Sequence, residues 1–395
     1  MFNVKAVGLP FLLIFLVLGC GGKAVQPISS KIISQSSSFL ELVPGNSIAS
    51  LADDMDVDSL SLAIERSLQY FTRFNDGDVY YLGARQSTVA EMEETLKAFL
   101  DIVRGSESDQ VKQKKIREAF DFYKSLGDDK KGRVIFTGYY EPILNGSLEQ
   151  TTQYRYPLYR SPDETVVLNA GRNVGRMVKG EVLPHYKRAE IDSAKSLTGR
   201  NLEIVWVDDF VDLFFLQIQG SGKVRLPDGK LIQVGYAQSN GYPYRSISNY
   251  MLEKGMLSKN EISLQAIKKY LREHPDKVER IFNYNERYVF FRLLDKGPIG
   301  SLGIPVTGGR TIASDPEVFP KGALALIRTR KPLLDKKGEV VKWISFSRFV
   351  VNQDTGAAIN GAGRIDIFCG GGAEAADIAG RLKEGGELIF LLKKR

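Results

Sequence analysis

Apolar side chains between residues 58 and 126 recur at the spacing of amphipathic helices. From Asp58 they fall three or four positions apart, as on one helix face: Leu60, Ile64, Leu68 and Phe71. A second helix is expected between the capping box Thr88-x-x-Glu91 and Gly105. A third is expected over 109–126, with one apolar face made of Val111, Ile116, Phe120 and Tyr123. We interpret the three apolar stripes as packing faces.

From Arg133 onward the pattern changes to short apolar runs separated by Gly, Pro and Asn, which is typical of a β-rich region. The expected strands cover residues 134–142, 154–160, 204–219, 231–237 and 288–291. Helices are expected at 247–254, at 262–272 behind the capping box Ser258-x-x-Glu261, and at 373–383. The chain should therefore be mainly β with flanking helices.

The most informative pattern lies near the C-terminal end. Residues 343–351 form an apolar-rich run typical of a strand, and Asp354 begins a turn. The run after it alternates with period two, so that Ile365 and Ile367 share one face while Asp366 faces the other way. If the isoleucines face the core, Asp366 sits on a rigid strand and points to an open surface. A rigid strand can hold an acid catalyst in a fixed position. The spacing alone, however, favours an ordinary solvated carboxylate without a catalytic role.

Size, charge and histidine content limit the classes of function that the chain can have. The chain has 395 residues, enough for two domains, and a net charge of +7 that is spread along it. This charge suits an anionic polymer without selecting one, and no zinc-finger spacing or nucleotide-binding glycine loop indicates a nucleic acid partner. With only His185 and His274, a histidine metal cluster is excluded and a histidine triad is disfavoured. We therefore expect no metal or cofactor, and acid–base chemistry carried by carboxylates.

The N-terminal residues 1–19 are expected to be a signal peptide, since an apolar run follows Lys5, the only early charge. The sequence Val-Leu-Gly-Cys at 17–20 resembles a bacterial lipobox, which makes Cys20 the lipidated residue. Glycines after Cys20 indicate the outer membrane, and the Ser-, Gly- and Pro-rich stretch 20–49 is expected to be a tether. The alternative is an ordinary secretory peptide with an incidental cysteine. With Cys20 lipidated, Cys369 would remain unpaired, and we expect it to be buried without a catalytic role.

Short blocks along the chain resemble one protein family. In chain order they are Phe-Thr-Gly-Tyr-Tyr (136–140), Arg-Ala-Glu-Ile (188–191), Gln-Gly-Ser-Gly (219–222), Asn-Gly (240–241) with Tyr-Arg-Ser-Ile (244–247), Val-Phe-Phe (289–291), Ala-Ser-Asp (313–315) with Pro-Lys-Gly (320–322), and the run 354–368. Together they are similar to the membrane-bound lytic murein transglycosylase A family and its C-terminal three-aspartate domain. The three aspartates fall on Asp315, Asp354 and Asp366, with one more residue between the last two than in the family.

The resemblance implies a fold with two domains. A double-psi β-barrel domain, formed by 50–141 together with 294–395, is interrupted by a second, smaller β-domain over 142–293. A groove between the two domains holds the glycan strand in this family.

The resemblance also implies an activity. Such an enzyme cleaves peptidoglycan between N-acetylmuramic acid and N-acetylglucosamine without water and leaves 1,6-anhydro ends. Asp366 matches the family's catalytic acid, which then acts as base, and Asp354 is expected to assist it. We expect Arg364, which would lower the pKa of Asp366, to be turned away or paired elsewhere. Polar and aromatic residues of the matching blocks are candidates for glycan binding: Thr137, Tyr139, Tyr140, Gln217, Gln219, Ser221 and Tyr242.

Expected partners are peptidoglycan glycan strands and, through the lipid anchor, the outer membrane, with other cell-wall enzymes as further candidates. Two alternatives remain open at this point. One is a glycoside hydrolase that uses water and a second carboxylate, Asp354 or Glu374, beside Asp366. The other is a non-catalytic lipoprotein that binds the glycan of the cell wall in the same groove.

Overall fold

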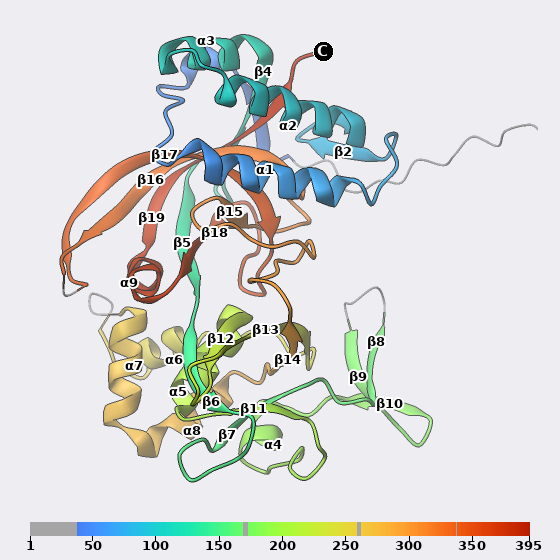
Figure 1. Cartoon of the computed structure of the whole chain (residues 1–395), viewed down its shortest axis with the longest axis vertical. Coiled ribbons are helices and arrows are strands. Elements are labelled where there is room, and N and C mark those ends of the chain that lie inside the picture. Colours follow the sequence, from blue (N-terminus) through green and yellow to red (C-terminus); the bar gives the residue numbers. More distant parts are fainter. Residues whose placement is uncertain (1–37, 169–172, 259–261, 337) are drawn as a thin grey trace, which may run out of the picture.

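The computed structural model describes residues 38–168, 173–258, 262–336 and 338–395 (Figure 1). The predicted signal peptide, the Cys20 lipidation site and the tether up to residue 37 lie outside these residues. Strand β1 (Leu40–Val43) lies within the predicted tether and pairs with β4 (Phe120–Ser125), so the tether prediction is wrong from Leu40 onward. Every helix in the described part of the chain is too short or too polar to cross a membrane.

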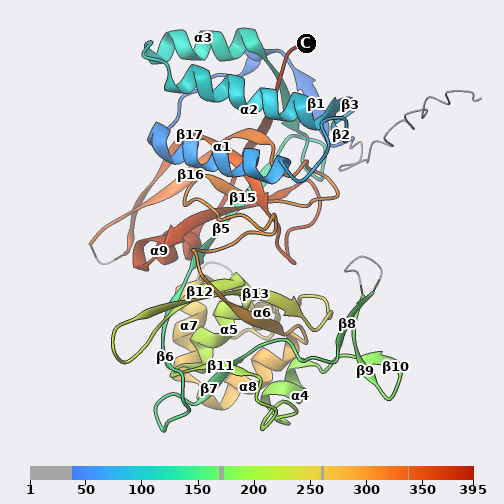
Figure 2. The ribbon, with the colours of Figure 1, turned by 45° about the vertical axis from the view of Figure 1, so that its right-hand side comes forward.

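The protein is mainly β with flanking helices, as predicted, and consists of two β-rich bodies. Figures 1 and 2 show the larger body above the smaller one, with the two connected through β5. The larger body contains both the N-terminal part of the described chain and its C-terminal end. The smaller body is therefore an insertion into the larger one.

Six strands of the larger body close into the predicted β-barrel, because β5, at one end of the strand order, also pairs with β19. The pairs β18–β5 and β15–β17 are parallel, and the other pairs in the ring are antiparallel. The barrel interior is filled by apolar side chains such as Phe136, Leu326 and Ile365. The six strands are β5 (Val134–Glu141), β15 (Thr311–Ala313), β16 (Leu324–Leu334), β17 (Val340–Asp354), β18 (Arg364–Gly371) and β19 (Lys383–Lys393).

Helices cover the barrel on the side away from the smaller body (Figure 1). The capping box predicted for Thr88 and Glu91 is present and begins α2. The Phe99 ring of α2 packs on the Phe349 ring of β17, with ring centroids 4.7 Å apart. The covering elements are η1 (Gly45–Ser47), α1 (Val57–Phe71), β2 (Val79–Leu82), β3 (Arg85–Thr88), α2 (Val89–Arg104) and α3 (Asp109–Ala119); α9 (Ala373–Arg381) lies beside β5 and β18.

The smaller body is built on a sheet with the order β14-β13-β12-β6-β11-β7. Its strands are β6 (Ile143–Ser147), β7 (Tyr156–Tyr159), β11 (Glu203–Val207), β12 (Ser221–Arg225), β13 (Leu231–Ser239) and β14 (Val289–Leu294). A separate small sheet contains β8 (Thr165–Leu168), β9 (Asn173–Val178) and β10 (Glu181–Pro184). The helices are α4 (Arg188–Asp192), α5 (Phe210–Gln219), α6 (Ile247–Glu253), α7 (Leu264–Glu273) and α8 (Pro275–Tyr284).

The single strand predicted over 204–219 is wrong, because β11 ends at Val207 and α5 follows it. The Asp209 carboxylate caps α5 by accepting hydrogen bonds from the backbone N–H groups of Val211 and Asp212. Helix α5 packs both into the core of the sheet and against α6, α7 and α8, so apolar side chains surround most of it. A helix buried on nearly all sides lacks the polar stripe by which an amphipathic helix is recognised.

Two further predictions need correction. The helix expected over 109–126 ends at Ala119, and the next residues form β4, which pairs with both β1 and β19. Phe120 and Tyr123 are spaced as on a helix face, whereas Phe120 and Phe122 alternate as in a strand, so only strand pairing decides between the two. The helix expected to begin at 262 starts at Leu264 behind a Ser263 cap, while Glu261 of the predicted capping box lies outside the described residues. Helix α8, which begins at Pro275, was not predicted.

Candidate active site

A groove of about 790 Å³ lies between the two bodies. The larger body contributes Tyr139, Asp354 and Asp366, which come from β5, the end of β17 and β18. The smaller body contributes residues at the end of α5 and the start of β12, and these include Gln217, Gln219 and Ser221. The volume falls within the range of about 300–1,000 Å³ that is typical of ligand sites.

Asp366 lies on β18 with its side chain facing the groove. Ile365 and Ile367 on the other face are buried in the core, as the alternating pattern predicted. In the parallel pairing of β18 with β5, Asp366 lies opposite Thr137. The Thr137 hydroxyl donates a hydrogen bond of 2.6 Å to Oδ1 of Asp366. The strand backbone and this hydrogen bond together hold the carboxyl in one orientation.

Asp354 lines the same groove, and both of its carboxyl oxygens accept hydrogen bonds from the protein. Its Oδ2 accepts a 2.7 Å hydrogen bond from the Tyr139 hydroxyl. Its Oδ1 accepts hydrogen bonds of 2.8 Å from the backbone N–H groups of Ser301 and Thr355. The Tyr139 ring also packs against Phe368, with ring centroids 5.1 Å apart. Asp354 is therefore a positioned carboxyl group with both oxygens engaged.

The two carboxyl groups share an unusual electrostatic environment. Burial raises the pKa of Asp366, the charge of Asp354 adds to this effect, and the Thr137 hydrogen bond and the charge of Arg364 oppose it. Burial also raises the pKa of Asp354, against the hydrogen bonds from Tyr139 and from the Ser301 and Thr355 backbone. The site therefore favours a protonated carboxyl group at higher pH than an exposed aspartate would.

The expectation for Arg364 is only partly met. Its guanidinium donates 3.3 Å hydrogen bonds to the Thr137 hydroxyl and to the backbone carbonyl of Ala358. These partners engage Arg364 but keep it in the neighbourhood of Asp366, because Thr137 binds both residues. Arg364 is therefore paired elsewhere, as expected, but it is not turned away from Asp366, because its charge still lowers the pKa of Asp366.

Two carboxylates hold the turn that leads into β18. Asp315, the first of the three aspartates, accepts a 2.7 Å hydrogen bond from the Gly361 N–H through Oδ2. Oδ1 of Asp128 accepts hydrogen bonds of 2.6 and 2.9 Å from the N–H groups of Ala362 and Gly363. Three successive amides just before β18 are thus paired. Sequence reasoning missed Asp128, because nothing near it in the chain indicates a contact more than two hundred residues away.

The predicted glycan-binding residues fall into two groups. Gln217, Gln219, Ser221 and Tyr139 line the groove, and Thr137 lies directly behind Asp366. Tyr140 and Tyr242 are not among the residues that line it, and their contact with glycan stays a prediction. Tyr140 is buried beside α9, because successive side chains of β5 point to opposite sides and Tyr139 already faces the groove. The Tyr242 hydroxyl donates a hydrogen bond to the His185 carbonyl within the smaller body.

Gln217 and Gln219 differ in how their amides are used. Oε1 of Gln219 accepts a 3.0 Å hydrogen bond from the Tyr140 backbone N–H and so connects the two bodies. Oε1 of Gln217 is buried and has no hydrogen-bond partner within the described residues. A buried acceptor without a partner costs free energy unless something donates to it. Gln217 therefore brings a buried acceptor without a protein partner to the groove lining.

Other lining residues were missed by the sequence reasoning. Arg287 lies two residues before β14 and Arg292 lies within it, and both bring positive charge to the groove. Ser301 comes from the loop that returns the chain to the barrel. The glycines and the proline just before Ser301 predict a loop without placing it. Cys369 is half-buried rather than buried, and its surroundings raise the pKa of the thiol to about 12. Within the described residues, no group of three or more His, Cys, Asp or Glu side chains is placed to hold a metal ion.

Comparison with known proteins identifies the family. The MltA specific insert domain matches residues 135–292, and the 3D domain matches residues 310–392. The chain is 31% identical over 276 residues to the membrane-bound lytic murein transglycosylase A of Escherichia coli K12, which is 69% of each protein. The matched segments overlap the two predicted domains, whose limits at 142, 293 and 294 stay a prediction.

Solved structures agree over most of the chain. A membrane-bound lytic murein transglycosylase from Agrobacterium tumefaciens has a TM-score of 0.72 at 28% identity, with 89% of this chain and 95% of that chain covered. Escherichia coli MltA with bound chitohexaose has a TM-score of 0.71 at 25% identity, with 94% and 98% covered. The chain therefore belongs to the membrane-bound lytic murein transglycosylase A family and is a lytic murein transglycosylase.

Proposed function

We propose that the groove binds a glycan strand of peptidoglycan and that Asp366 alone serves as acid and then as base. The observation that carries this proposal is the half-buried carboxyl group of Asp366, which has a raised pKa and faces a groove between two bodies. The neighbouring Asp354 keeps both oxygens occupied by protein donors. Chitohexaose, the ligand of the related Escherichia coli structure, supports a β-linked glycan as occupant.

The proposed reaction takes place in two steps. Protonated Asp366 donates its proton to the oxygen that joins C1 of N-acetylmuramic acid to N-acetylglucosamine, and the C1–O bond breaks. The resulting Asp366 carboxylate then removes the proton from the C6 hydroxyl of the same muramic acid, and O6 forms a bond to C1. The carboxyl group is protonated again, and water is not consumed. Asp354 contributes its negative charge, which favours protonated Asp366 at the start.

The surroundings of the carboxylates disfavour the hydrolase alternative. A hydrolase needs a second carboxylate with a free oxygen to activate water or to attack C1. Tyr139, Ser301 and Thr355 already donate to the oxygens of Asp354, which makes Asp354 a weaker base or nucleophile. Glu374, the other candidate, is exposed and does not line the groove. A single-carboxylate reaction fits this arrangement better.

Product analysis tests the reaction directly. We expect purified sacculi digested by the protein to release fragments ending in 1,6-anhydromuramic acid, lighter by one water than reducing fragments in mass spectra. Digestion in heavy-oxygen water should leave these ends unlabelled, because no water enters the product. Labelled reducing ends as the main product would establish the hydrolase. Retention of glycan without any release of fragments would establish a wall-binding protein.

We also propose that Cys20 carries the lipid that anchors the protein to the outer membrane. The lipobox-like sequence at 17–20 supports this, as does the membrane-bound description of the relative from Escherichia coli. Cys20→Ala should move the protein from the membrane to the soluble periplasmic fraction, measured by fractionation and immunoblotting. Cys369→Ala, which leaves the anchor intact, is the control and should stay with the membrane. Unchanged membrane fractionation of the Cys20 variant would contradict lipidation at this residue.

A further inference from the structure

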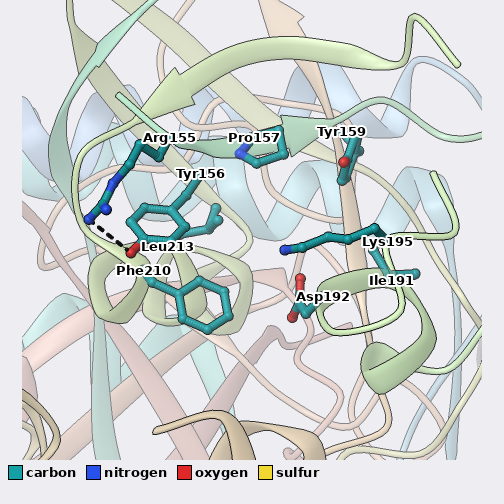
Figure 3. Close-up of a pocket in the computed structure, with 9 residues that line it drawn as sticks. All are labelled: Arg155, Tyr156, Pro157, Tyr159, Ile191, Asp192, Lys195, Phe210 and Leu213. Atoms are coloured by element: carbon teal, nitrogen blue, oxygen red, sulfur yellow. Dashed lines mark hydrogen bonds between the residues drawn. The ribbon is translucent and has the colours of Figure 1, made fainter. Parts of the chain in front are cut away.

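A second cavity, of about 240 Å³, lies within the smaller body and shares no lining residue with the groove. It is formed by β7 and the residue before it, by the end of α4 with the turn that follows, and by the start of α5. Figure 1 shows β7 and α4 at the end of the smaller body that faces away from the barrel. The lining residues that bear on binding are Arg155, Tyr156, Asp192, Lys195 and Phe210 (Figure 3).

One wall of this cavity is a fixed aromatic surface. The rings of Tyr156 and Phe210 are stacked, with centroids 5.2 Å apart and an angle of 24° between their planes. The Phe282 ring packs against the Phe210 ring, with ring centroids 5.3 Å apart. Both lining aromatics are half-buried, so part of each ring stays accessible from the cavity. Such a surface can bind the apolar part of a ligand. Because the rings are already packed in place, little side-chain conformational entropy is lost on binding.

The cavity also contains two cationic side chains, Arg155 and Lys195, and the charge of Lys195 acts on Asp192 by opposing the rise in its pKa that burial causes. Arg155 lies over the Tyr156 ring and donates a 3.3 Å hydrogen bond to its hydroxyl. Neither Arg155 nor Lys195 forms a salt bridge among the residues that the structure describes. Asp192 is the acidic residue of the cavity wall, and it is already paired at 3.1 Å with the buried guanidinium of Arg188. Arg155 and Lys195 are therefore available to an anionic ligand.

The backbone at Lys195 is held in a conformation that is uncommon for a residue with a side chain. Its φ of +57° lies in the left-handed region, and its carbonyl accepts a 3.0 Å hydrogen bond from the Thr198 N–H. Figure 3 shows the Lys195 side chain extending across the cavity above Asp192. Strained backbone of this kind is concentrated at functional sites. The turn thus places Lys195 beside the cavity.

We propose that this cavity is a second cell-wall site, which takes the carboxylate-bearing stem peptide of peptidoglycan. The inference rests on the proposed function, because that function identifies peptidoglycan as the polymer. The cavity is smaller than the range of about 300–1,000 Å³ for whole small-molecule ligands, so it suits one or two residues of a chain. Stem carboxylates meet Arg155 and Lys195, and apolar stem side chains meet the Tyr156 and Phe210 rings.

This placement implies that the site holds a different part of the wall from the bond being cut. Phe210 and Leu213 of the cavity lie at the start of α5, whereas Gln217 and Gln219 of the groove lie at its end. The nine-residue step from Phe210 to Gln219 corresponds to about 14 Å along the helix axis. Most of α5 between these points is buried, so the cavity and the groove are at opposite ends of a packed core. The cavity therefore engages a neighbouring stem and keeps the enzyme on cross-linked wall.

The test is a titration of the full-length protein with a soluble stem tetrapeptide, followed by calorimetry. Wild type is compared with the double variant Arg155→Ala/Lys195→Gly. Glycine adopts the φ of Lys195 without strain, so the ammonium is removed at no backbone cost. We expect the double variant to bind the peptide at least about tenfold more weakly, because two charge-assisted contacts are lost. Wild-type affinity should also fall as salt concentration rises.

A matched control removes the same charges elsewhere on the smaller body. Arg225→Ala/Lys179→Gly makes the same substitutions at exposed residues outside both cavities, and Lys179 also has a positive φ, of 50°. This control should bind the peptide like wild type. Equal peptide affinity of the Arg155/Lys195 variant and wild type would overturn the proposal. Peptide-free glycan strands that compete for the cavity as well as the peptide does would also overturn it, in favour of a sugar site.

Turnover of peptide-free glycan separates this proposal from the function of the groove. The Arg155/Lys195 variant should cleave such strands at the wild-type rate, because the groove is untouched. Absence of peptide binding by a wild-type protein that forms anhydro ends would refute the second site and leave the proposed function standing. Peptide binding without any anhydro product would refute the proposed function instead.

Discussion

Replacing Asp366 by asparagine is expected to lower the rate of glycan cleavage by at least about 10²–10⁴-fold, the usual contribution of a general acid–base group. Asparagine keeps the shape of the side chain but cannot deliver a proton to the glycosidic oxygen. The variant should fold and still bind glycan, because Ile365 and Ile367 hold β18 in the core. Its thermal midpoint should be unchanged or slightly higher at neutral pH. The reason is that burial disfavours the charged form of Asp366, and asparagine carries no charge.

The pH dependence gives a second measure of the same role. The folded-state pKa of Asp366 is raised, so wild-type activity should be present below that pKa and fall as pH rises through it. The residual activity of Asp366→Asn should lack this descending limb. Asp354→Asn serves as the comparison and should lose less activity, because it alters the positioned neighbour rather than the acid. Full activity in the folded Asp366→Asn protein would remove Asp366 from the mechanism.

Replacing Arg310 by methionine is expected to destabilise the larger body by about 3–5 kcal/mol, as breaking a buried ion pair does. Arg310 is fully buried, with 0% of its surface exposed, and pairs with Asp53 at 2.6 Å. Its guanidinium also donates to the Ser59 hydroxyl and to the backbone carbonyls of Asp56 and Phe349. Methionine fills most of the space but leaves these acceptors and a carboxylate without their donor. Thermal unfolding should show the loss.

A matched substitution separates burial from charge. Lys331→Met also removes one cation from a salt bridge, with Asp54 at 2.6 Å, but both side chains there are partly exposed. It should cost about 1 kcal/mol or less, in line with other exposed pairs. If the Arg310 and Lys331 variants lost equal stability, the buried network around Arg310 would not have the role assigned to it. The folded fraction of the Arg310 variant should keep its glycan-cleaving activity, since Arg310 does not line the groove.

Secondary structure could be predicted from the chain wherever the pattern reflects one-sided burial. The capping box at Thr88 begins α2 as expected, and the helices near 247 and 373 lie within two residues of their predicted limits. Prediction failed where an element is surrounded by other elements. Helix α5 is apolar nearly all round, and β4 carries aromatics whose spacing also fits a helix. In both cases long-range packing overrides the local signal.

By itself the sequence determined that Asp366 sits on a strand with its carboxyl group opposite an isoleucine face, because period-two alternation is a property of neighbouring residues. Only the tertiary structure decided what that carboxyl group meets. Thr137, which donates to it, is 229 residues away in the chain, and barrel closure through β5, β18 and β19 brings the two together. The same closure places Tyr139 on Asp354 and the end of α5 across the groove. Contacts between distant segments depend on how sheets close and pack, and no local pattern encodes them.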